Sequence, residues 1–134
     1  MSPRSGTVGR FGEDIACDYL TENDYTILER NWRTRKGELD IICTYGDLLV
    51  FVEVKTRGPG SLQLPGEALN AEKKIRLLRA ASEYLTKKRL WETASRFDLI
   101  ALRLREDDVD LEHIQNVIDA SEIMGGRHAP WQPW

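Results

Sequence analysis

The chain has 134 residues, of which 41% are hydrophobic and 31% charged, and its formal net charge is −3 at pH 7. This length and composition are typical of one globular domain and exclude a disordered or low-complexity chain. The chain has no apolar run long enough for a membrane helix, no apolar N-terminal stretch and only two cysteines, so we expect a cytoplasmic protein with free thiols.

The hydrophobic pattern predicts an α/β protein in the order helix, three strands, helix, two strands. Because the strands are apolar on both faces, we expect one mixed sheet flanked by helices. Gly12 in the first helix indicates close packing there, since glycine otherwise weakens a helix. In chain order the expected elements are a helix at 8–23, strands at 25–33, 38–44 and 48–55, a helix from residue 67 or 70 to 89, and strands at 96–105 and 111–118.

We expect one domain over residues 1–123, followed by an irregular tail at 124–134. The tail contains two glycines and two prolines together with Trp131 and Trp134. Disordered tails are usually poor in aromatic residues. We therefore expect the two tryptophans to pack on the domain or on a partner rather than to stack on bases.

The dipeptide Gly46-Asp47 predicts a two-residue hairpin between the second and third strands. In that register Asp40 lies opposite Glu53, although directly opposed like charges destabilise a sheet. A three-residue loop would instead place Asp40 opposite Val52. Both strands are apolar on both faces, so the pattern alone fixes the register only weakly.

Two opposed carboxylates about 5 Å apart at their Cβ atoms could bind one divalent cation, Mg²⁺ or Mn²⁺. Lys55 would lie on the same face as Glu53, and Glu13 would lie at the rim where the first helix meets the sheet. This set favours phosphodiester hydrolysis, with Lys55 stabilising the charge that develops. Glu38 would face Lys55, either as an accessory site residue or as its partner in a cross-strand ion pair.

The acidic net charge means that nucleic-acid contact requires a local basic patch. The second helix is rich in lysine and arginine, a pattern that usually marks a solvated face. Because the third strand leads toward the same region, Arg57, Lys73 and Arg76 are candidate phosphate contacts. Gln63, in the Gly/Pro-rich loop at 56–66, is a candidate hydrogen-bonding partner of substrate.

Five short motifs occur in order along the chain: Gly9-Arg10-Phe11-Gly12-Glu13, Arg30-Asn31-Trp32-Arg33, Gly37-Glu38-Leu39-Asp40, Phe51-Val52-Glu53-Val54-Lys55-Thr56-Arg57, and Pro65-Gly66-Glu67-Ala68 with Lys73. Together, over roughly residues 8–118, they resemble the YraN family of bacterial proteins. That family is similar to archaeal Holliday junction resolvases and to the PD-(D/E)xK nucleases. One departure is that Leu39, not proline, precedes Asp40.

The resemblance implies a restriction-endonuclease-like core. It implies that Asp40 and Glu53 ligate Mg²⁺ or Mn²⁺ with help from the Val54 carbonyl. It further implies that Lys55 is the catalytic lysine and Glu13 an accessory carboxylate. The implied activity is a structure-selective endonuclease on DNA, with branched or single-stranded DNA as the substrate, and cutting two strands symmetrically would require a homodimer.

Two other classes of function remain open. One is a non-catalytic nucleic-acid- or protein-binding module that retains the fold. The intact residues Glu13, Asp40, Glu53 and Lys55 argue against it, because a binding module has no need of opposed carboxylates. The other is a metal-dependent enzyme that acts on RNA or nucleotides.

Overall fold

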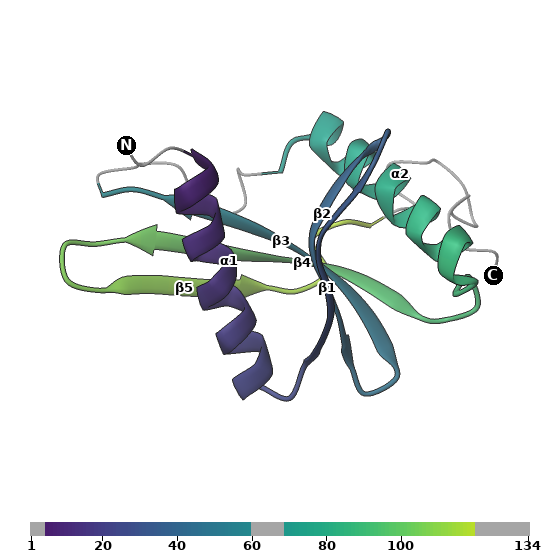
Figure 1. Ribbon diagram of the computed structural model, residues 1–134, viewed down its shortest axis with the longest axis horizontal. Helices are drawn as coiled ribbons and strands as arrows, with labels where there is room; N and C mark the ends of the chain where they lie inside the picture. Colours follow the sequence, from purple (N-terminus) through teal and green to yellow (C-terminus); the bar gives the residue numbers. More distant parts are fainter. Residues whose placement is uncertain (1–4, 60–68, 120–134) are drawn as a thin grey trace.

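The computed structural model describes residues 5–59 and 69–119, which form two helices and one sheet (Figure 1). None of the helices in these ranges is long and apolar enough to span a membrane. The elements are α1 (Ser5–Glu22), β1 (Thr26–Thr34), β2 (Gly37–Tyr45), β3 (Leu48–Arg57), α2 (Ala71–Lys88), β4 (Ser95–Leu104) and β5 (Val109–Ile114).

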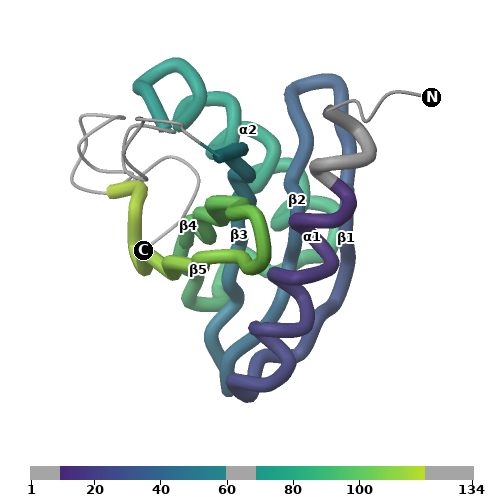
Figure 2. Tube along the Cα trace, turned by 90° about the vertical axis from the view of Figure 1, so that its left-hand side faces the viewer, coloured from purple at the N-terminus to yellow at the C-terminus, as the bar shows by residue number. Residues whose placement is uncertain are grey.

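The sheet is mixed, with its five strands in the order β1-β2-β3-β4-β5. All neighbouring pairs are antiparallel except β3 and β4, which are parallel and joined through α2, as a parallel connection requires. The two helices cover opposite faces of the sheet, each over its own apolar cluster (Figures 1 and 2). This is the α/β architecture and element order that the sequence predicts.

The β2–β3 hairpin has the predicted two-residue turn, with Gly46 at φ +60°. Tyr45 pairs with Leu48, so the three-residue alternative is wrong. Regular pairing continues to Ile41 opposite Val52, where it ends. The predicted alternation also fails near this point, because Leu39 packs in the cluster under α2 and Ile41 in the cluster under α1. The two strands therefore cease to form a regular ladder just before Asp40.

Helix α1 packs on β3 through the predicted close approach at Gly12. A Cβ atom there would collide with the Thr56 Oγ1 atom and lie 3.2 Å from Leu102 Cδ1. Ala16 and Leu20, further along the helix, are fully buried. Phe11, in contrast, is 51% exposed although its spacing predicts a place on the apolar face.

Helix α2 begins one residue after Asn70, whose side chain accepts a hydrogen bond from the Lys73 backbone N–H (2.8 Å). This is an N-cap, which satisfies a backbone donor that the helix itself leaves unpaired. The last strand, β5, ends earlier than predicted, at Ile114. Two residues later Asn116 has φ +57° and its N–H donates to the Asp98 carboxylate, which turns the chain out of the ladder.

Candidate active site

Asp40 and Glu53 come together where regular β2–β3 pairing ends. Asp40 Oδ2 accepts a hydrogen bond from the Val54 N–H (2.9 Å). Glu53 lies on β3, is 7% exposed, and shares a hydrogen bond with the Asp40 carboxyl group. Because an ionised carboxylate can only accept hydrogen bonds, the pair must hold a proton between them.

The electrostatics of Asp40 agree with that geometry. Burial and then the negative charge of Glu53 raise the pKa of Asp40 from its ordinary value of 3.8 to about 8. The hydrogen bond from the Val54 N–H opposes the rise, and the charge of Glu13 adds to it. In the absence of a metal ion, the Asp40 carboxyl group therefore favours its protonated form at neutral pH.

Lys73 reaches this pair from the first turn of α2. Its Nζ atom lies 3.1 Å from Glu53 Oε2, so the residue predicted as a phosphate contact is the counter-ion of Glu53. The side chain of Lys73 is 33% exposed, so one part of it remains open to solvent. Sequence spacing could not find this contact, because it depends on where α2 crosses the sheet.

Glu13 lies at the rim, as predicted. Its side chain is 13% exposed, and its Oε1 atom is 3.8 Å from a nitrogen of Arg30. Arg30, on β1, also forms a hydrogen bond with Asp14 (2.7 Å). Nothing in the local sequence pattern indicates that Arg30 lies beside the rim carboxylate, because only the packing of α1 against β1 brings the two together.

The predicted placement of Glu38 is wrong. It pairs with Arg33 across β1 and β2, and its Oε2 atom lies 2.8 Å from Arg33 Nε. The expected ion pair with Lys55 does not form, because β2 and β3 no longer pair regularly there. Lys55 is half-buried and lies two residues after Glu53 on the same face of β3.

The other predicted nucleic-acid contacts lie around the same face. Arg76 is exposed on α2, three residues after Lys73. Arg57 ends β3 beside Arg103 of β4, its partner in the parallel register. Sequence analysis missed Arg103, because only the β3–β4 pairing brings it there. Gln63 and the tail at 124–134 lie outside the described residues.

The donor set at Asp40 and Glu53 fits a magnesium-type site. Mg²⁺ commonly uses one or two carboxylates and completes its shell with water and substrate phosphate. Within residues 5–59 and 69–119, no three or more His, Cys, Asp or Glu side chains are grouped to form a metal cage. Two carboxyl groups could hold an oxygen-loving cation that keeps several of its water ligands.

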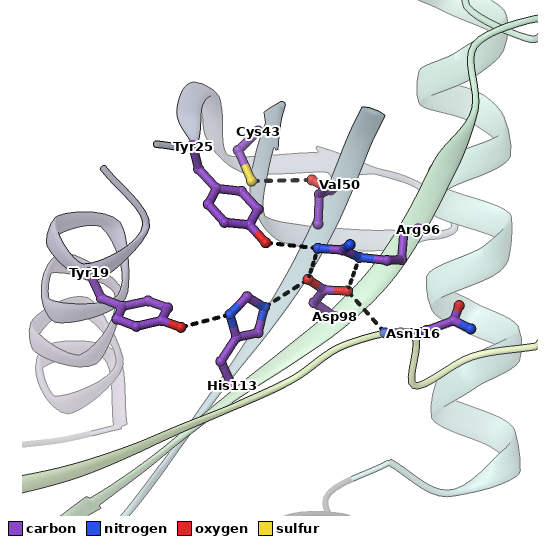
Figure 3. Close-up of polar contacts among 8 residues, drawn as sticks. All are labelled: Tyr19, Tyr25, Cys43, Val50, Arg96, Asp98, His113 and Asn116. Atoms are coloured by element: carbon purple, nitrogen blue, oxygen red, sulfur yellow. Dashed lines mark hydrogen bonds and ion pairs between the residues drawn. The ribbon is translucent and has the colours of Figure 1, made fainter. Parts of the chain in front are cut away.

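A second polar cluster, which the sequence analysis missed, lies on the opposite face of the sheet (Figure 3). Asp98 is 1% exposed and accepts hydrogen bonds from Arg96 through both oxygens (2.8 Å each). His113 Nε2 lies 2.7 Å from Asp98, and its Nδ1 lies 3.0 Å from the Tyr19 hydroxyl. The Arg96 side chain also donates to the Tyr25 hydroxyl (2.8 Å). The cluster therefore ties α1 and the start of β1 to β4 and β5.

Burial acts to raise the pKa of Asp98, but the hydrogen bonds from His113, Arg96 and the Asn116 N–H outweigh it and hold that pKa below its ordinary value. Asp98 is thus an ionised, fully partnered carboxylate. It has no neighbouring carboxylate that raises its pKa, as Glu53 raises the pKa of Asp40. We infer that this cluster stabilises the fold and takes no part in the candidate site.

These features define an α/β protein with a mixed sheet in which a partly buried Asp40 meets a buried Glu53, with Lys73 in contact with Glu53. Residues 12–102 match the model of the uncharacterised protein family UPF0102, the YraN family, and the chain belongs to that family.

Relatives in this family align over nearly the whole chain. A UPF0102 protein of Nitratidesulfovibrio vulgaris (strain DP4) is 45% identical over 126 residues, 94% of each chain. A UPF0102 protein of Syntrophotalea carbinolica is 47% identical over 84% of this chain and 92% of its own. The solved structure of Pyrococcus furiosus SfsA in complex with Ca²⁺ matches 78% of this chain and 60% of its own, with a TM-score of 0.36 and 14% identity. At that level of similarity, the match carries no argument.

Proposed function

We propose that this protein is a metal-dependent endonuclease that hydrolyses phosphodiester bonds in DNA. The observation that carries the proposal is the meeting of two carboxyl groups, the partly buried Asp40 and the buried Glu53, beside the Val54 N–H and the Lys73 ammonium group. Like charges brought together away from water are costly, and a divalent cation would remove that cost. A bound Mg²⁺ or Mn²⁺ would lower the pKa of a water ligand and polarise a phosphoryl oxygen.

The chain's own residues have separate tasks in this proposal. Asp40 and Glu53 hold the cation, and the Val54 N–H fixes the orientation of the Asp40 carboxylate. The Val54 carbonyl is a further ligand. Lys55, on the same face as Glu53, stabilises negative charge on the reacting phosphate. Glu13, at the rim, orients water near the site.

The substrate side of the proposal rests on the basic residues around the site. Arg57 and Arg76 would contact phosphates on either side of the scissile bond, contacts that position a nucleic acid without reading its sequence. We propose branched DNA as the preferred substrate, with single-stranded DNA as the second candidate, and a homodimer as the form that cuts two strands.

The two cysteines of the chain are free and buried, and from this we propose a cytoplasmic location.

The direct test is a cleavage assay on labelled four-way junction, flap, single-stranded and duplex DNA, each with Mn²⁺, Mg²⁺ or EDTA. The wild-type protein should cut in Mn²⁺ or Mg²⁺ and not in EDTA, and Glu53→Gln should abolish cutting. Glu38→Gln is the matched control, because Glu38 pairs with Arg33 at the surface, and it should retain activity. Equal cutting by Glu53→Gln would overturn the proposal.

A second variant separates binding from chemistry. Lys55→Ala should keep the metal affinity of the wild type and lose at least 100-fold in cleavage rate, typical of removing one charge-stabilising group. Absence of cleavage on every DNA by the wild type, together with DNA binding, would favour the alternative of a binding module. Cleavage of RNA alone would favour the other alternative.

A further inference from the structure

Lys73 lies in an unfavourable place for a cation. The N-terminus of a helix carries partial positive charge, which disfavours a lysine in the first turn. The N-cap hydrogen bond from the Lys73 N–H to Asn70 also fixes its backbone there. Its ammonium group instead finds its partner in Glu53, at 3.1 Å. Glu53 is only 7% exposed, so this ammonium group lies against a carboxyl group that solvent hardly reaches.

We propose that Lys73 is an internal cation that a divalent metal must displace from Glu53, so that Lys73 sets the metal affinity of the site. This inference rests on the proposed metal site at Asp40 and Glu53. The two carboxylates supply at most two negative charges, which a divalent cation neutralises by itself. An ammonium group retained within a few ångströms would then repel the metal in a site where burial strengthens electrostatic interactions.

Displacement of Lys73 requires no change in the fold. The cap at Asn70 holds the first turn of α2 in place, and the four-carbon stem of lysine can rotate freely. The side chain is already one-third exposed, so the ammonium group has a short path to solvent. Lys73 is therefore a positioning residue that acts through Glu53.

Calorimetric titration of the full-length protein with MnCl₂, without DNA, tests the proposal. Lys73→Met should bind Mn²⁺ at least tenfold more tightly than the wild type. Lys73→Arg, which preserves the charge, should stay within about threefold of the wild type. Lys74→Met is the matched control, because Lys74 carries the same charge in the same first turn, and its affinity should change less than twofold.

A measurement on the unsubstituted protein keeps the test valid if Lys73→Met does not fold. Titration with Mg²⁺ should shift the NMR signal of the Lys73 ε-methylene group, and that of Lys74 should shift much less. Equal shifts for the two lysines would overturn the inference.

The outcomes separate this inference from the proposed function. If the wild type binds Mn²⁺ and Lys73→Met binds it no more tightly, Lys73 does not compete with the metal and the inference is overturned, while the metal site stands. If neither protein binds Mn²⁺, the metal site itself is overturned, and the inference with it. Tighter binding by Lys73→Met that is lost on adding Glu53→Gln supports both.

Discussion

Asp40 and Glu53 form a site that is electrostatically unfavourable in the metal-free protein. A carboxyl pair in a sheet repels when both groups are ionised, and here the repulsion is relieved by a shared proton and by the ammonium group of Lys73. Perturbed, buried carboxyl groups of this kind concentrate at functional sites. The contrast with Asp98, whose every neighbour stabilises its charge, shows that burial alone does not produce this state.

The raised pKa of Asp40 predicts an unusual pH dependence of stability. Burial and Glu53 raise that pKa from 3.8 to about 8, so between these values the folded protein holds a proton that the unfolded chain has released. The free energy of unfolding should therefore fall as pH rises from about 5 to 8, by at most about 1.4 kcal/mol per pH unit. Urea unfolding at a series of pH values, without divalent cations, measures this slope.

Asp40→Asn provides the control, because asparagine has no proton to lose. Its stability should change less with pH over the same window, and it should exceed the wild type at pH 8. The exposed substitution Glu38→Gln should leave the slope unchanged. A wild-type slope equal to that of Asp40→Asn would contradict the shared proton.

The Asp98 cluster predicts a large effect on stability. Asp98→Asn removes the buried charge that Arg96 and His113 surround, and leaves the partly buried guanidinium group of Arg96 without its counter-ion. Breaking a buried ion pair from one side costs about 3–5 kcal/mol, so we expect a loss near 3 kcal/mol in urea unfolding. Asp107→Asn, in the exposed β4–β5 turn, should change stability by about 0.5 kcal/mol or less. A loss below about 1 kcal/mol for Asp98→Asn would show that the cluster is dispensable.

At the scale of elements, local patterns predicted most of the fold. The strands of the hairpin were predictable because Gly46-Asp47 fixes the turn and the apolar run on each side fixes the strand. The spacing to Asp40 and Glu53 then followed from the register, and the structure confirms the register from Tyr45 to Ile41. Helix positions were accurate to within a few residues for the same reason, since periodicity and capping are local signals.

Contacts between distant elements were not predictable in this way. Nothing near His113 in the sequence resembles a ligand pattern, yet the β4–β5 pairing brings it beside Asp98. The ion pair of Lys73 with Glu53 depends on the path of the crossover helix. The mistaken Glu38–Lys55 pair came from extending a ladder past its end. Sequence alternation cannot show where two strands separate.

The packing of α1 on β3 predicts the effect of a single methyl group. Gly12→Ala places a Cβ atom against Thr56 Oγ1 and Leu102, and overpacking of this kind costs about 1–3 kcal/mol. Part of that cost is offset by the better helix propensity of alanine. We therefore expect a net loss of about 1–2 kcal/mol in chemical unfolding.

A double-mutant cycle isolates the contact. In a Thr56→Ala background the same Gly12→Ala change should be neutral or stabilising, because the colliding hydroxyl is gone. Gly58→Ala is the matched control, since a Cβ atom at Gly58 meets open space, and it should be close to neutral. An equal loss from Gly12→Ala in both backgrounds would contradict the packing argument.

In the whole molecule, the two faces of the sheet have different roles. The face under α1 contains the Asp98 cluster, which connects elements from both ends of the described chain (Figure 3). The face under α2 contains Glu53 and, further along β3, Lys55, and Lys73 reaches Glu53 from α2. Both faces carry an apolar cluster. We infer that the face under α1 adds a fully partnered carboxylate, Asp98, whereas the face under α2 adds a carboxylate, Glu53, that can also serve a cation.

The measurement that tests this account most directly is anomalous X-ray diffraction from crystals of the wild-type protein grown with Mn²⁺. The account predicts a manganese peak in contact with carboxylate oxygens of both Asp40 and Glu53, with the Lys73 ammonium group moved away from Glu53. Crystals of Asp40→Asn, grown in the same way, should lack the peak. A manganese peak elsewhere, with Lys73 still in contact with Glu53, would contradict the central claim.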